Sequence, residues 1–133
     1  MIITRGSTIR ILIVDDEDSI LEEAAEALTD EGFECLVANS VAAAVEIVKT
    51  TPGIVLILTD LKMPGQSGVD LINTVKIKLG GKMKFIVMSG HADLNIEDNG
   101  IDITSYPFLT KPLDIDHLVA TVASVLTAKA EPL

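Results

Sequence analysis

The stretch ILTDLKMPGQSG, residues 57–68, decides the fold class because it turns an apolar run into a loop at a single carboxylate. Asp60 stands at the tip of the run, and Pro64, Gly65 and Gly68 follow it. Proline and glycine residues of this kind shape a bend before the next element. A strand that only filled a core could end at any turn residue. The charge at this tip therefore raises the question of how the other strands end.

Apolar runs and helical patterns alternate along the whole chain. Short apolar runs predict strands at residues 9–14, 33–38, 54–59, 84–88 and 107–110. Helical spacing of apolar residues predicts helices at residues 18–32, 41–50, 69–79 and 115–129. We expect these helices to be capped by Asp18 or Ser19, by Asn39 or Ser40, and by Asp114, with Gly32 ending the first. The segment 92–106 has only a thin apolar face, so whether it forms a regular helix stays open.

This alternation predicts an α/β fold, with a parallel five-stranded sheet, helices on both faces and right-handed crossovers. The 133 residues suit one domain, residues 1–133, with a core at about residues 9–128 between a short N-terminal extension and a C-terminal tail. The sequence does not decide the oligomeric state, nor whether the full-length protein carries a further effector domain.

The composition limits the partners and the compartment. There are 20 acidic and 10 basic residues, which give a net charge of −10. Phosphate backbones and anionic lipid surfaces repel such a charge, so we expect neither direct nucleic-acid binding nor membrane binding. The single cysteine, Cys35, allows no internal disulfide, and no run approaches the roughly 18 apolar residues of a membrane span. We expect a cytoplasmic protein.

Polar side chains follow four of the five predicted strands. Asp15 and Asp16 come after the first strand, Asp60 after the third, Ser89 after the fourth and Lys111 after the fifth. Ligands of open α/β sheets bind at these carboxyl ends. If the first and third strands are neighbours, the three carboxylates converge and need a cation. Lys111 supplies one positive charge, and the hard oxygen ligands suit Mg²⁺.

This cluster predicts phosphoryl chemistry. A carboxylate beside Mg²⁺ and a lysine is arranged to attack phosphorus and become an aspartyl phosphate. Two rival functions fit less well. Phosphatases with an aspartyl nucleophile usually carry a second aspartate two residues later, where this chain has Lys62. A nucleotide or flavin binder would place a glycine-rich phosphate loop after the first strand, where this chain has acids.

The sequence resembles the receiver domain of two-component response regulators, over about residues 9–128. Four stretches carry the resemblance: ILIVDDE (residues 11–17), LTDLKMPGQSG (58–68), VMSGHAD (87–93) and FLTKPLD (108–114). The resemblance implies a flavodoxin-like fold with strand order 2-1-3-4-5, as in the chemotaxis regulator of the family. It also implies a phosphorylation switch of a two-component phosphorelay, which catalyses only its own phosphorylation and dephosphorylation and is not otherwise an enzyme.

The resemblance assigns roles to individual residues. Asp60 is the phosphoacceptor, and the phosphoryl group comes from a sensor histidine kinase or a histidine phosphotransfer protein. Mg²⁺, or Mn²⁺ in its place, is held by Asp15, Asp16, Asp60 and the backbone carbonyl of Lys62. Lys111 binds the phosphoryl group, Ser89 and Phe108 are the switch residues, and Pro112 follows a cis peptide bond. The output partner or effector domain is unknown.

Two side chains are expected to overhang the mouth of the site. Lys62 stands two residues after Asp60, and His91 stands two residues after Ser89. We hypothesise that Lys62 and His91 modulate the lifetime of the phosphoryl group by controlling the access of water.

One segment departs from the family pattern. The helix expected between His91 and Phe108 is weakened by polar residues and glycine, so whether this chain uses the family's usual output face stays open. An alternative function is therefore a degenerate receiver that acts as a phosphorylation-independent docking module. The presence of Asp16, Asp60 and Lys111 together argues against it.

Overall fold

The computed structural model describes residues 8–63, 65–79, 82–90 and 106–127. In chain order the elements are β1 (Arg10–Val14), α1 (Asp18–Asp30), β2 (Glu34–Ala38), α2 (Val41–Thr50), β3 (Ile54–Asp60), β4 (Lys62–Met63), β5 (Gln66–Ser67), α3 (Gly68–Leu79), β6 (Lys84–Ser89), β7 (Phe108–Thr110) and α4 (Ile115–Thr127). Pro64, Gly80, Gly81, His91 and nearly all of the ambiguous segment 92–106 lie outside the described residues, so the predictions made for them stay predictions.

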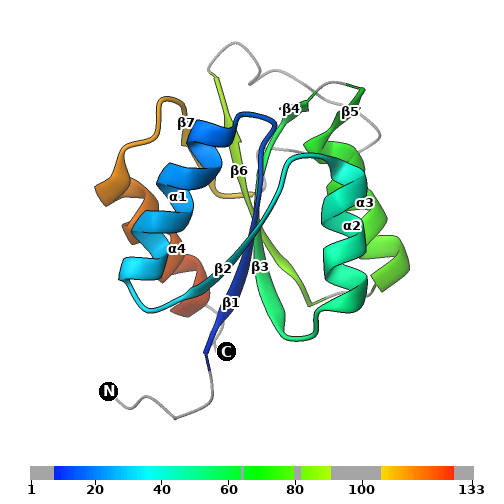
Figure 1. Cartoon of the computed structure of the whole chain (residues 1–133), viewed down its shortest axis with the longest axis horizontal. Helices are drawn as coiled ribbons and strands as arrows, with labels where there is room; N and C mark the ends of the chain where they lie inside the picture. Colours follow the sequence, from blue (N-terminus) through cyan, green and yellow to red (C-terminus); the bar gives the residue numbers. More distant parts are fainter. Residues whose placement is uncertain (1–7, 64, 80–81, 91–105, 128–133) are drawn as a thin grey trace.

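Five of the strands form one sheet in the order β2-β1-β3-β6-β7, and every neighbouring pair in it is parallel (Figure 1). The predicted order 2-1-3-4-5 is confirmed, because β6 and β7 are the fourth and fifth strands of this sheet. The edge position of β7 suits Pro107, which directly precedes it, since proline has no N–H for a strand neighbour.

Helices cover both faces of the sheet, as predicted, with α1 and α4 on one face and α2 and α3 on the other (Figure 1). The apolar side chains of the central strands alternate between two buried clusters. Leu12, Val14 and Ile57 pack with residues of α2 and α3. Ile11 and Ile13 pack with residues of α1 and α4. Burial on both faces explains why these strands are continuous apolar runs.

The helix caps agree with the sequence in part. The Ser40 hydroxyl accepts a hydrogen bond from Ala43 N at 3.1 Å, and Asp114 Oδ1 accepts one from His117 N at 3.2 Å. Gly32 takes φ +99° after α1, as its predicted role in ending the helix requires. The prediction of Asp18 or Ser19 as the first cap was wrong, because Glu17 holds that position without a side-chain cap bond.

The loop after β3 contains a feature that the sequence did not predict. β4 and β5 pair in antiparallel fashion, with Lys62 opposite Ser67. The turn between them contains Gly65 at φ +82°, a conformation that glycine adopts without strain. This small hairpin carries the chain from Asp60 into α3. Among the described helices, none combines the length and apolar character that crossing a bilayer requires.

Candidate functional site

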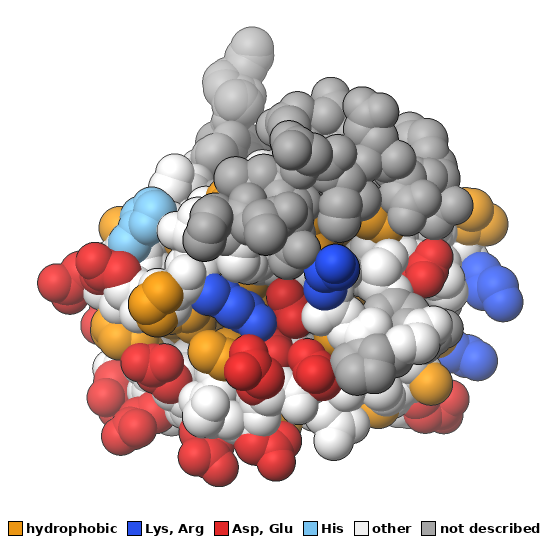
Figure 2. All heavy atoms as spheres, turned by 90° about the horizontal axis from the view of Figure 1, so that it is seen from above, with side chains coloured by type: hydrophobic (Ala, Val, Ile, Leu, Met, Phe, Trp, Pro, Cys, Tyr) orange, Lys and Arg blue, Asp and Glu red, His pale blue; other side chains and the backbone are white. Residues whose placement is uncertain are grey.

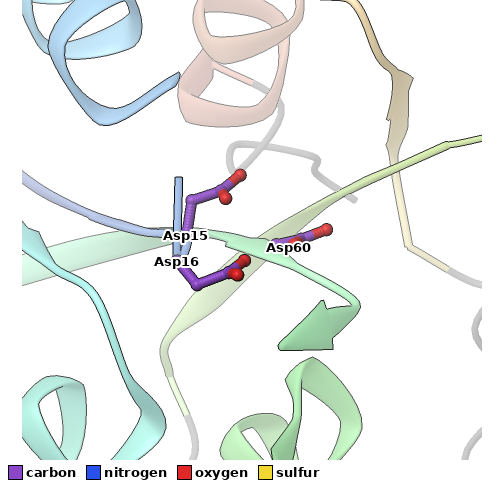
Figure 3. Close-up of side chains that lie close together, drawn as sticks. All are labelled: Asp15, Asp16 and Asp60. Atoms are coloured by element: carbon purple, nitrogen blue, oxygen red, sulfur yellow. The ribbon is translucent and has the colours of Figure 1, made fainter. Parts of the chain in front are cut away.

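The carboxyl ends of the central strands bring three carboxylates together. β1 runs into Asp15 and Asp16, and the neighbouring strand β3 ends on Asp60. Figure 3 shows the three side chains directed into one space, where a carboxylate oxygen from each lies within 4.8 Å of the others. Asp15 and Asp60 are buried, with 0% and 4% of their surface exposed, whereas Asp16 is exposed. The predicted convergence is confirmed.

Lys111 completes the cluster from the far edge of the sheet. Its Nζ lies 2.8 Å from Asp15 Oδ2 and 3.3 Å from Asp60 Oδ2. It also donates a hydrogen bond to Glu17 Oε1 at 3.3 Å. The Lys111–Pro112 peptide bond is cis, as expected. One ammonium group is thus shared among three carboxylates.

The pKa values of the cluster reflect, above all, the burial of its carboxylates. Burial raises the pKa of Asp60 from 3.8 to about 6, and the charge of Asp15 adds to the rise, while Lys111 and the backbone N–H of Lys62 oppose it. Burial also raises the pKa of Asp15, against the contact with Lys111. Burial lowers the pKa of Lys111, but the contact with Asp15 and the charges of Asp60 and Asp15 outweigh it and raise the pKa overall.

A buried carboxylate oxygen of Asp15 that lacks a hydrogen-bond donor indicates whether a metal ion fits the site. Its Oδ1 accepts a hydrogen bond from Glu17 N at 2.9 Å. Its Oδ2 is buried and receives no hydrogen bond of good geometry, although Lys111 Nζ lies 2.8 Å away. Buried oxygens of this kind are normally satisfied. A hard divalent cation among Asp15, Asp16 and Asp60 would satisfy it, so the donor set fits Mg²⁺ or Mn²⁺.

Gly68 fixes the backbone beneath Asp60. A Cβ atom added to Gly68 would lie against the carbonyl oxygen of Asp60 and 3.2 Å from its carbonyl carbon. The Gly68 N–H donates to Leu61 O at 2.9 Å, and the Leu61 N–H donates to Met88 O at 3.0 Å. The first residue of α3 therefore packs directly on the backbone that carries the carboxylate, and only glycine leaves room for this contact.

The two predicted switch residues lie on neighbouring strands. Ser89 ends β6, one residue after Met88, the register partner of Asp60. Its side chain is buried, and its hydroxyl donates to Gly90 O at 2.9 Å. Phe108 opens β7 and is half-buried against the cluster of side chains shared with α2 and α3. Lys62 is exposed beside the site, while His91 lies outside the described residues.

Sequence reasoning missed one member of the cluster. Glu17 donates its backbone N–H to Asp15 and places its carboxylate on Lys111. An acidic residue after a strand looks like an ordinary solvated helix start, and the Glu17 side chain is indeed 58% exposed. The only signal available was its position directly after the two aspartates.

The face above the strand ends is electrostatically divided. Figure 2 shows most of the acidic side chains gathered on the side where α1 lies, whereas basic side chains lie in the middle and on the other side, with a few acidic ones among them. The exposed acidic residues of α1 are Asp18, Glu22, Glu23, Glu26 and Asp30. Any molecule that approaches this face therefore meets strong negative charge on one flank.

Comparisons with known proteins agree with this geometry. A family model described as the response regulator receiver domain matches residues 11–123. The transcriptional regulatory protein FixJ of Azorhizobium caulinodans is 32% identical over 120 residues, which cover 90% of this chain and 56% of FixJ. The phosphate regulon transcriptional regulatory protein PhoB of Pseudomonas aeruginosa is 36% identical over 118 residues, which cover 87% of this chain and 51% of PhoB.

A solved structure extends the similarity to three dimensions. The crystal structure of a response regulator receiver protein from Pseudomonas putida superimposes with a TM-score of 0.79 at 28% identity. The match covers 90% of this chain and 99% of that one. By contrast, the chain spans only about half the length of FixJ and PhoB.

Proposed function

This chain belongs to the family of response regulator receiver domains, and we propose that it is a phosphorylation switch in which Asp60 accepts the phosphoryl group. One observation carries the proposal: the buried Asp60 carboxylate shares an ammonium group, 3.3 Å away, with a second buried carboxylate. Burying two acids beside one lysine is costly for a structural role alone. A site that binds a further cation and a phosphoryl group would explain why the chain keeps this costly arrangement.

The chemistry assigns a task to each side chain. An oxygen of Asp60 forms the new bond to phosphorus, while the donor's phosphorus–nitrogen bond breaks and its electron pair stays on the histidine ring of the kinase or phosphotransfer protein. Lys111 pairs with the phosphoryl oxygens as their charge develops. Asp15, Asp16, Asp60 and the Lys62 carbonyl would hold Mg²⁺ or Mn²⁺. When bound, the metal neutralises charge on the transferring group.

The switch residues respond to the new group. Ser89 exchanges its present hydrogen bond to Gly90 O for one to a phosphoryl oxygen, and Phe108 turns into the space that this movement opens. The affinity for a partner then changes, provided that the partner binds one of the two states more tightly than the other. Lys62 and His91 set the lifetime of the aspartyl phosphate. An unchanged lifetime after replacing both with alanine would remove this last assignment.

Intact mass after incubation with acetyl phosphate tests the function. We expect a gain of one phosphoryl group in the presence of Mg²⁺ and no gain in EDTA. Asp60→Asn should abolish the gain, whereas Asp116→Asn, on the exposed surface of α4, should leave it intact. A folded native protein that gains no phosphoryl group under any of these conditions would instead favour a docking module that works without phosphorylation.

A further inference from the structure

A second surface lies at the opposite end of the sheet from Asp60. A hollow of about 350 Å³ opens between the end of α2, the start of β3 and the segment before β6. These ends of the elements lie in the lower part of Figure 1. A second hollow, of about 380 Å³, adjoins it and shares Pro52 and Gly53. We call the two adjoining hollows together the groove.

Apolar side chains line the first hollow. Val48 and Met83 are half-buried in its wall, and Ile54 and Val75 lie deeper. Val55 also lines it and keeps 38% of its surface exposed, which is high for an apolar residue in a strand. Apolar side chains that remain accessible in a concave site commonly mark a contact surface.

Two lysines also line the same hollow. Lys49 and Lys82 line it, and within the part of the chain that the structure describes neither has an ion-pair partner. Arg10, in the adjoining hollow, is already engaged by Glu34 Oε1 at 3.1 Å and by the Pro52 carbonyl oxygen. The two lysines are therefore the charges available to a partner.

This positive charge is local. Residues 41–90 contain six lysines and three carboxylates, and two of those carboxylates, Asp60 and Asp70, belong to the opposite end of the sheet. Residues 8–40 contain ten carboxylates and one arginine. On a chain with net charge −10, a small basic rim attracts a short acidic segment, whereas an extended polyanion such as nucleic acid is repelled by the rest of the surface.

We propose that this groove docks an acidic, amphipathic segment of a partner protein, with apolar side chains seated over Val55 and carboxylates paired with Lys49 and Lys82. A second copy of this chain fits less well. Its acidic helix α1 buries its own apolar side chains, Leu21, Ala24 and Leu28, and has none of them left to fill an apolar hollow. The proposal does not depend on phosphorylation, because the groove and the Asp60 cluster lie at opposite ends of the sheet.

Amide chemical shifts of the full chain, measured in two-dimensional NMR spectra, test the proposal. The probe is a synthetic peptide of about 14 residues, with leucines at helical spacing and glutamates between them. A control peptide keeps the leucines and replaces every glutamate with lysine. We expect the acidic peptide to shift the amides of Lys49, Val55, Lys82 and Met83, and the basic peptide to leave them unchanged.

Reversing the charge of Lys49 and Lys82 distinguishes docking at the groove from a general attraction between the peptide and the charged protein. Lys49→Glu combined with Lys82→Glu should weaken binding of the acidic peptide at least about tenfold, and Val55→Ser should weaken it with no change in charge. Lys76→Glu combined with Lys78→Glu changes the net charge equally on exposed positions of α3 that do not line the hollow, and should have little effect. Equal weakening by both pairs, shifts confined to other surfaces, or no shift at millimolar peptide would each overturn the proposal.

Discussion

Lys111 holds its ammonium group 2.8 Å from a carboxylate oxygen of Asp15, although β3 and β6 separate the strands that carry the two residues. The contact spans the sheet above Asp60, which Lys111 also reaches at 3.3 Å. One side chain from the edge of the sheet therefore balances acids at its centre. This arrangement makes the stability of the resting fold depend on Lys111.

Replacing Lys111 with methionine should be strongly destabilising at pH 7. The change leaves Asp15 and Asp60 buried without their cation, and such a loss costs about 3–5 kcal/mol of unfolding free energy. Urea unfolding in EDTA measures it. Glu17→Gln is the matched control, because this largely exposed partner of Lys111 should contribute less than about 1 kcal/mol. Comparable losses in the two variants would contradict the central role of the buried pair.

The raised pKa of Asp60 predicts a pH-dependent stability. Because this pKa moves from 3.8 to about 6 on folding, the folded state binds more protons than the unfolded state between these values. The unfolding free energy of the native protein therefore loses a contribution from Asp60 as pH rises through this window. Asp60→Asn removes the titrating carboxylate, so the variant does not lose this part of its unfolding free energy as pH rises. In EDTA the variant should match the native protein near pH 4 and exceed it by about 1–3 kcal/mol above pH 6.

A control for this pH series is Asp116→Asn, which removes an exposed carboxylate from α4. Its difference from the native protein should stay within about 0.5 kcal/mol at every pH. If Asp60→Asn gave the same flat profile, the carboxylate would not be strained by its surroundings in the way that its burial indicates.

Metal binding should raise the thermal stability of the unmodified protein. Mg²⁺ that binds only the folded state adds about 1.4 kcal/mol for each tenfold excess over its Kd, and each kcal/mol shifts Tm by about 3–5 °C in a domain of this size. Asp16→Asn removes one of the three clustered carboxylates and should reduce the shift at a fixed Mg²⁺ concentration. Asp18 lies outside the cluster, so Asp18→Asn should keep the full shift in Tm. An equal shift in both variants would place the ion elsewhere.

Gly68→Ala should destabilise the protein and disturb the site. The added methyl group would push against the Asp60 carbonyl, and a clash with backbone cannot be relieved by a rotamer change, so we expect a cost of about 2–4 kcal/mol. Gly90→Ala is the matched control, because a Cβ atom there has nothing within 4 Å. Similar unfolding free energies for the two variants would show that the loop after β3 adjusts freely.

Much of the fold was predictable because burial leaves a strong pattern. The strands at 54–59 and 84–88 are continuous apolar runs, and the structure extends each by a single residue, to Asp60 and Ser89. The convergence of the polar strand ends followed from parallel geometry once the first and third strands were neighbours. That adjacency came from family resemblance, since the alternation of strands and helices does not by itself fix the strand order.

The features that escaped prediction are short or depend on tertiary contacts. A hairpin of two-residue strands, β4 and β5, has too few residues to show a period. The contact between Glu17 and Lys111 joins residues 94 positions apart, and nothing near Glu17 in the sequence distinguishes it from a solvated acid. The cap of α1 was misplaced for a similar reason, because several polar residues in a row all suit the position.

The short length of β7 affects which part of the site opens most easily. This edge strand has three residues and pairs with β6 alone, whereas β1 and β3 are each held on both sides. Backbone amides in such a strand are expected to exchange with solvent sooner than those of the sheet centre. We therefore expect the carboxylates to stand on the slowly exchanging part of the molecule and the lysine on a part that opens more readily. When the charge between them changes, we expect the segment that carries the lysine to move first.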